Sequence, residues 1–140
     1  MLLNKGNVRT SDLKVSSKNM IAWQKAKIVE VTQKNHGWKS YTREQIAWIL
    51  IVKELKCWRL QHPDIKVIMD YIMSKNFKSI VHKAIKGKTL LLAYAPEGFK
   101  KEDGKVKLMW KEDYAKLHDA SIRKADSYLL LNLTDILTTK

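Results

Sequence analysis

The segment that decides the fold reads VSSKNMIAWQKAKIV at positions 15–29, EVTQKNHGWKSY at 30–41 and TREQI at 42–46. Ser16 or Ser17 can cap a helix, because a serine hydroxyl accepts a hydrogen bond from the free N–H groups of the first turn. Met20 and Trp23 follow at helical spacing and supply apolar anchors. The first part of the segment therefore predicts a short helix that ends near Lys27.

A polar hairpin is expected after this helix. Val31, Trp38 and Tyr41 mark two short strands around QKNHG, and Gly37 can supply the positive φ that a tight turn needs. Upstream of the helix, Thr10 or Ser11 can cap a very short helix. The order is thus a helical turn, a helix and a hairpin.

A longer helix is predicted from about Arg43 to Trp58. Thr42 is a good N-cap and Gln45 stands at the capping-box position. Apolar residues cover more than one side of this helix, so we expect it to be buried on more than one face, by the C-terminal region or by a second subunit.

Two more helices are predicted next, and after Gly87 the sequence changes from a helical to a strand-like pattern. One helix begins near Pro63 and ends near Met73, and an amphipathic helix over 76–86 stops at Gly87. Beyond it, KTLLLAYAP, VKLMW and SYLLLNL read as strands, with a short helix containing Tyr114 and Leu117 before the last strand and a turn of helix at TDIL. A helical reading of DSYLLLNLTDIL stays open.

The expected fold class is α+β, in two parts. Residues 1–74 form a mainly helical domain, and residues 75–140 form a helix followed by a small β-containing element. The formal charge of +13 is concentrated toward the N-terminal side: residues 1–40, 41–87 and 88–140 contribute +6, +5 and +2. Such an asymmetry is typical of a protein that binds a polyanion.

Several other functional classes find little support in the sequence. No apolar run approaches the roughly 20 residues of a membrane span, and the start of the chain lacks a signal-peptide core. We expect a cytoplasmic protein with no membrane partner, and the single Cys57 agrees with this. No metal or other cofactor is expected, because the four His and the one Cys show no ligand spacing. No enzymatic activity is expected either, because the acids near His118 lack the paired spacing of a catalytic cluster. Cys57, Trp23, Trp48 and Trp58 are interpreted as core residues.

The first half of the chain has the outline of a winged helix-turn-helix, and three stretches resemble the MerR family of transcription regulators. They are VSSKNMIAWQKAKIV, HGWKSYTREQIAWI and VKELKCWRLQHPDIKVIM, within residues 8–73. The resemblance implies that the second helix enters the major groove of double-stranded DNA and that the wing lies along the backbone. The sequence departs from the family at Ile21 and Ala22, where members usually have a DNA-contacting Arg and an aromatic residue. It also lacks the long coiled-coil helix through which members dimerise.

Residue by residue, the resemblance and the polar face of the helix predict one set of DNA contacts. The set comprises Ser16, Ser17, Lys18, Asn19, Gln24, Lys25, Lys34, His36, Lys39, Tyr41 and Arg43. Lysines are suited to phosphates, and the amides of Asn and Gln are suited to base edges. We expect a sequence-specific DNA-binding homodimer that acts as a transcription regulator and has a possible protein partner at its C-terminal element. A plasmid or phage accessory protein, or a basic protein-interaction or RNA-binding module, is the alternative.

Overall fold

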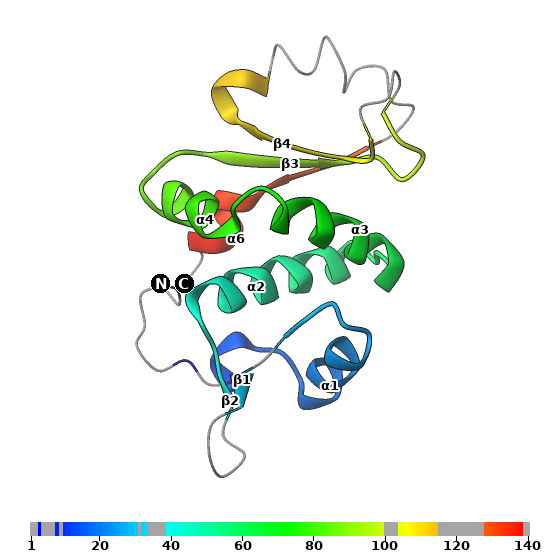
Figure 1. Cartoon of the computed structure of the whole chain (residues 1–140), viewed down its shortest axis with the longest axis vertical. Helices are drawn as coiled ribbons and strands as arrows, with labels where there is room; N and C mark the ends of the chain where they lie inside the picture. Colours follow the sequence, from blue (N-terminus) through cyan, green and yellow to red (C-terminus); the bar gives the residue numbers. More distant parts are fainter. Residues whose placement is uncertain are drawn as a thin grey trace. The chain divides into compact units, whose positions relative to one another are not determined.

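A computed structural model describes residues 3, 8, 10–30, 32–33, 39–99, 104–114 and 128–138, with the backbone alone at 10, 32–33 and 39–40. Figure 1 shows the order of the elements along the chain. The chain divides into two compact units. Unit 1 comprises Met1–Lys66 with Ile136–Lys140, and unit 2 comprises Val67–Asp135. The division falls inside a helix, earlier in the chain than the boundary at 74 that the sequence suggests.

In unit 1, a 3-10 turn, η2 (Thr10–Leu13), is followed by a short helix, α1 (Ser17–Lys25). Ser16 is the N-cap of α1, and its Oγ accepts a hydrogen bond from the Asn19 N–H at 3.1 Å. Met20 and Trp23 are buried, as their spacing predicts. The helix stops because Lys27 adopts a left-handed conformation, with φ of 60°.

The hairpin that follows is short. β1 (Thr32–Gln33) pairs antiparallel with β2 (Lys39–Ser40), so that Thr32 lies opposite Ser40 and Gln33 opposite Lys39. Of the predicted tip QKNHG at 33–37, residues 34–37 lie outside the described residues, as does Trp38. The structure therefore describes the two paired strands of the predicted hairpin.

The longest helix of unit 1 is α2 (Arg43–Cys57), and both hydrogen bonds of the predicted capping box form. The Thr42 Oγ1 accepts from the Gln45 N–H at 3.1 Å, and the Thr42 N–H donates to the Gln45 Oε1 at 2.9 Å. Two side chains then tie α2 to the N-terminal segment. The Trp48 indole N–H donates to the Ile28 carbonyl at 2.6 Å, and the Lys53 ammonium donates to the Leu13 carbonyl at 3.4 Å. Apolar residues on more than one side of α2 are buried, as expected: Ile46, Ala47, Trp48, Ile49, Ile51, Val52 and Leu55.

Two residues expected in the core are at the surface instead. Cys57 is exposed and Trp58 is 56% exposed, so the prediction that they are core residues is wrong. Their position explains the difference, because α2 ends at Cys57 and Arg59 turns the chain with φ of 61°. The buried stripe of α2 therefore does not continue through Trp58, whose indole N–H instead donates to the Glu54 Oε1 at 3.3 Å.

Two helices precede the sheet of unit 2. α3 (His62–Met73) is the helix within which the two units divide, and Ile68 and Ile72 on its unit 2 half are fully buried. α4 (Phe77–Ile85) begins at Asn76, whose side chain accepts from the Ser79 N–H at 3.4 Å. The end of α4 agrees with the predicted stop, since Gly87 has φ of 108°.

The sheet of unit 2 has its most apolar strand in the middle. β3 (Leu90–Tyr94) is buried along its whole length and pairs antiparallel with both β4 (Val106–Trp110) and β5 (Leu129–Asn132), as Figure 1 shows. A strand buried on both faces is expected to read as a continuous apolar run, as LLLAY does. One face of the sheet carries a core cluster of Leu91, Ala93, Ala95, Phe99 and Met109.

Short helical segments follow the two outer strands, and the second of them runs from unit 2 into unit 1, which resumes at Ile136. η4 (Lys111–Asp113) follows β4, and the predicted short helix at this place is partly described, since Leu117 lies outside the described residues. α6 (Leu133–Thr138) follows β5, so DSYLLLNLTDIL is a strand in its centre and a helix at its end. The Thr134 hydroxyl accepts from the Leu90 N–H at 2.8 Å and donates to the Lys88 carbonyl at 2.9 Å, which links α6 to the start of β3. The class of the fold is α+β, as predicted, and no helix in the described ranges has the length and apolarity to cross a membrane.

Candidate nucleic-acid interface

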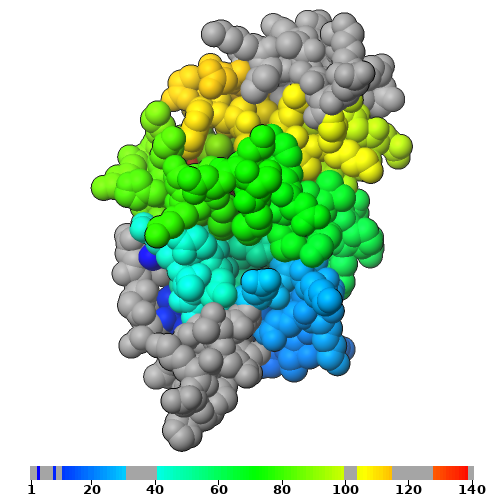
Figure 2. All heavy atoms as spheres, viewed as in Figure 1, coloured from blue at the N-terminus to red at the C-terminus, as the bar shows by residue number. Residues whose placement is uncertain are grey.

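The predicted contact residues of α1 occupy its solvent side. Ser16, Ser17, Lys18, Asn19 and Lys25 are all exposed. In Figure 2 the blue residues of this part of the chain lie at the surface. The helix therefore presents its polar residues as the sequence pattern suggests.

The centre of that solvent side is apolar. Lys18, Ile21, Ala22 and Lys25 are three or four residues apart and form one stripe along α1. Ile21 is 48% exposed and Ala22 is exposed as well, so two apolar residues lie between two lysines. This stripe can contact phosphates at its two ends and methyl groups between them.

Gln24 lies differently from the other predicted residues of α1. It stands one turn after Met20, which is fully buried, and is itself half-buried. Its Nε2 is buried and has no hydrogen-bond partner among the described residues. An unpaired buried amide costs about 1–3 kcal/mol. Gln24 is therefore on the packed side of the helix and not on the stripe that Lys18 and Lys25 share.

The junction between the hairpin and α2 holds two more predicted residues. Tyr41 is half-buried directly after β2, and Arg43 is half-buried as the first residue of α2. The Nε of Arg43 is buried and, within the described part of the chain, has no hydrogen-bond partner. The capping box at Thr42 fixes the backbone between these two side chains.

The remaining predicted contacts fall in the hairpin. Lys34 and His36 lie outside the described residues, and of Lys39 only the backbone, in β2, is described. The structure thus places Lys18 and Lys25 on one exposed stripe of α1 and Gln24 on its packed side, and it places Tyr41 and Arg43 on either side of the cap residue Thr42. Ile21 and Ala22 are the stripe residues that the predicted set omits, although their helical spacing from Lys18 and Lys25 was a usable signal.

The electrostatics of α1 favour anions. The helix carries two exposed lysines and no acidic residue. Among the residues that the structure describes, no cluster of three or more His, Cys, Asp or Glu side chains could hold a metal ion. The exposed surface of α1 thus combines lysine, amide and apolar side chains.

Comparisons with known proteins gave no match: no family model matches the chain, and no similar curated protein or solved structure was found.

Proposed function

We propose that the protein binds double-stranded DNA through unit 1, as a winged helix-turn-helix similar to the MerR family in its first half. The observation that carries the proposal is the exposed stripe of α1, with lysines at its ends, no acidic residue and a serine cap. A helix about 10–12 Å across fits the major groove, which is about 12 Å wide. The β1–β2 hairpin then follows the backbone beside the groove.

Each part of this surface has a separate role in the proposal. Lys18 and Lys25 bind phosphates and set the register of the helix. Asn19 reads a base edge through its amide, which can donate and accept at once. The strongly basic first two thirds of the chain, at +6 and +5, attract the duplex over a longer range.

The salt dependence of duplex binding tests the proposal. The affinity of the full chain for a labelled duplex is measured by fluorescence anisotropy over a series of salt concentrations. Lys18→Ala and Lys25→Ala should each flatten the slope of log K against log salt by about one unit, as expected for the loss of one phosphate contact. The control is Lys105→Ala, which removes an exposed lysine of unit 2. A double variant of Lys18 and Lys25 that binds as the wild type does would refute the proposal.

Selection of bound fragments from random duplex DNA distinguishes a transcription regulator from an accessory DNA-binding protein. We propose a transcription regulator that acts as a homodimer, and such a protein should enrich a palindromic site because a two-fold axis relates its two half-sites. The accessory role in a plasmid or phage uses the same surface. Duplex binding without an enriched sequence would favour that second role.

A further inference from the structure

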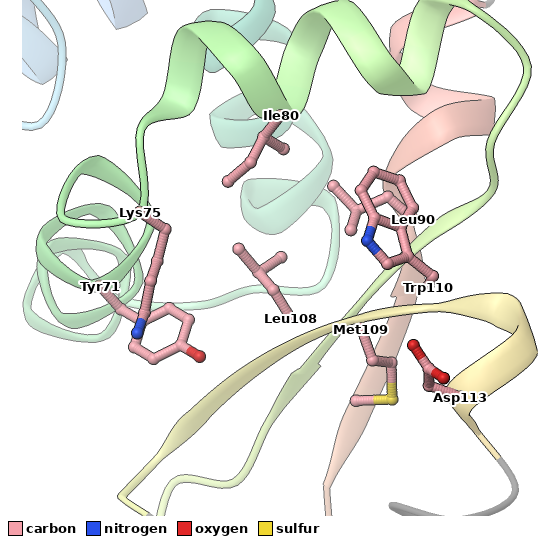
Figure 3. Close-up of a pocket in the computed structure, with 8 residues that line it drawn as sticks. All are labelled: Tyr71, Lys75, Ile80, Leu90, Leu108, Met109, Trp110 and Asp113. Carbon is pink, nitrogen blue, oxygen red and sulfur yellow. The ribbon is translucent and has the colours of Figure 1, made fainter.

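Unit 2 contains an open groove between its helices and one face of the sheet. Its volume is about 300 Å³. Figure 3 shows Tyr71 and Lys75 on one side, Trp110 on the other, and Ile80 and Leu108 between them. Tyr71, Ile80, Leu108 and Trp110 are each only half-buried. The groove thus leaves apolar and aromatic surface open to solvent.

A lysine accompanies each of the two rings. The Nζ of Lys75 lies 5.2 Å from the centroid of the Tyr71 ring, and the Nζ of Lys88 lies 5.6 Å from the centroid of the Trp110 ring. Both lysines are exposed. A lysine side chain is flexible, so its ammonium can move from the ring to a nearby anion. Each ring of the groove therefore has a lysine ammonium beside it; Lys75 itself lines the groove, whereas Lys88 does not.

The surrounding segment is strongly basic. Residues 71–96 contain five lysines and no acidic residue, and all five lysines are exposed. Lys78, Lys83 and Lys86 extend this charge along and beyond α4. Asp113 is the acidic residue that lines the groove, and it is exposed on η4. A ligand for this groove should therefore be anionic, with a flat apolar part that enters between the rings.

We propose that the groove binds a single-stranded nucleic-acid segment, with a base stacked on Tyr71 or Trp110 and the adjoining phosphates on Lys75 and Lys88. Stacking on aromatic side chains beside a basic surface is the usual way in which single strands are bound. A duplex keeps its bases inside and offers no ring to the groove. Lys83 stands one turn after the groove residue Ile80 on α4 and can hold a further phosphate, which favours a continuous strand over a free nucleotide. Asp113 can accept a hydrogen bond from an amino group of the base.

The test uses the full chain and a labelled thymidine oligonucleotide of about 12 nucleotides. Tyr71→Leu and Trp110→Leu keep apolar bulk but remove the ring, and each should weaken binding roughly 5- to 100-fold. Lys75→Gln and Lys88→Gln should each flatten the salt slope by about 0.7. Lys105→Gln, which removes an exposed lysine that neither lines the groove nor lies over one of its rings, should leave both quantities unchanged. Trp110→Phe, which keeps a ring, should retain most of the affinity.

The test of single-strand binding at the groove can succeed or fail independently of the proposed duplex binding by unit 1. The groove variants should keep wild-type affinity for duplex DNA, whereas Lys18→Ala and Lys25→Ala should keep wild-type affinity for the oligonucleotide. Far-ultraviolet circular dichroism and a melting curve show that each variant is folded. The proposal is overturned if Tyr71→Leu and Lys75→Gln bind the oligonucleotide as the wild type does. It is also overturned if the groove variants lose binding only to vesicles that contain phosphatidylserine, since the groove would then be a lipid site.

Discussion

At the scale of single residues, the most informative position is Ile21. It is exposed at the centre of the α1 stripe, at a place where the resembling family usually has a DNA-contacting Arg. An apolar side chain cannot pair with a phosphate, but it can pack against the methyl group of thymine in the major groove. Under the proposed function, Ile21 therefore contributes to sequence preference and not to general affinity.

This role predicts a specific response to the thymine methyl group. In a duplex that the protein enriches, replacing the contacted thymine by uracil should weaken wild-type binding about fourfold, because one apolar carbon loses its contact. Ile21→Asn should bind the thymine and uracil duplexes equally well. Anisotropy titrations with the two duplexes measure the difference. An unchanged thymine preference in Ile21→Asn would show that Ile21 does not touch the base.

Trp48 and Trp58 make a matched pair for a stability measurement. The Trp48 indole N–H is buried and donates to the Ile28 carbonyl at 2.6 Å, whereas Trp58 is 56% exposed. Trp48→Phe should lower the free energy of unfolding by about 1–3 kcal/mol, because the Ile28 carbonyl loses its donor inside the core. Trp58→Phe should change it by less than about 0.5 kcal/mol. Urea unfolding monitored by circular dichroism compares the two, and equal losses would contradict this account.

At the scale of elements, the helix starts are set by local chemistry. Ser16, Thr42 and Asn76 each accept a hydrogen bond from a backbone N–H three residues later. These bonds need only a short stretch of chain, so the starts of α1, α2 and α4 follow from the sequence. The strand VKLMW likewise agrees with β4, because its apolar run is short and flanked by polar residues.

The contact between Tyr114, which follows η4, and Tyr128, which precedes β5, predicts how stability depends on pH. The Tyr114 and Tyr128 hydroxyls are 3.3 Å apart, and this hydrogen bond, with burial and the charge of Tyr114, raises the pKa of Tyr128 above its ordinary 10.0. A raised pKa means that the folded state favours the neutral hydroxyl, so the stabilisation is present below pH 10.0 and is lost as pH rises through the folded pKa.

Removing one hydroxyl tests this contact. In Tyr114→Phe the pKa of Tyr128 should return toward 10.0, because the hydrogen bond and the neighbouring charge are both gone. A tyrosine-labelled sample titrated by carbon NMR reports the Tyr128 pKa directly. Tyr71→Phe, which leaves the pair intact, is the control. A Tyr128 pKa that is the same in Tyr114→Phe and in the wild type would contradict the assigned cause.

At the scale of the whole molecule, two of its surfaces carry exposed lysines. One is the α1 stripe in unit 1, and the other is the acid-free segment 71–96 in unit 2. The sequence indicates the first surface through its helical spacing and its resemblance to a known family. It indicates the charge of the second but not its groove, because Tyr71, Lys75, Leu108 and Trp110 come from separate parts of the chain.

The sequence by itself determined the α+β class, most helix starts, the strands β3 and β4 after Gly87 and the exposed lysines of α1. These features depend on capping, periodicity and turn residues, which act over a few neighbouring positions. The tertiary structure decided which polar residues are available. It turned Gln24 toward the packed side of α1, left Cys57 and Trp58 in solvent, and brought Tyr71 and Trp110 to one groove. Burial and long-range contact depend on how elements pack, and local pattern does not contain that information.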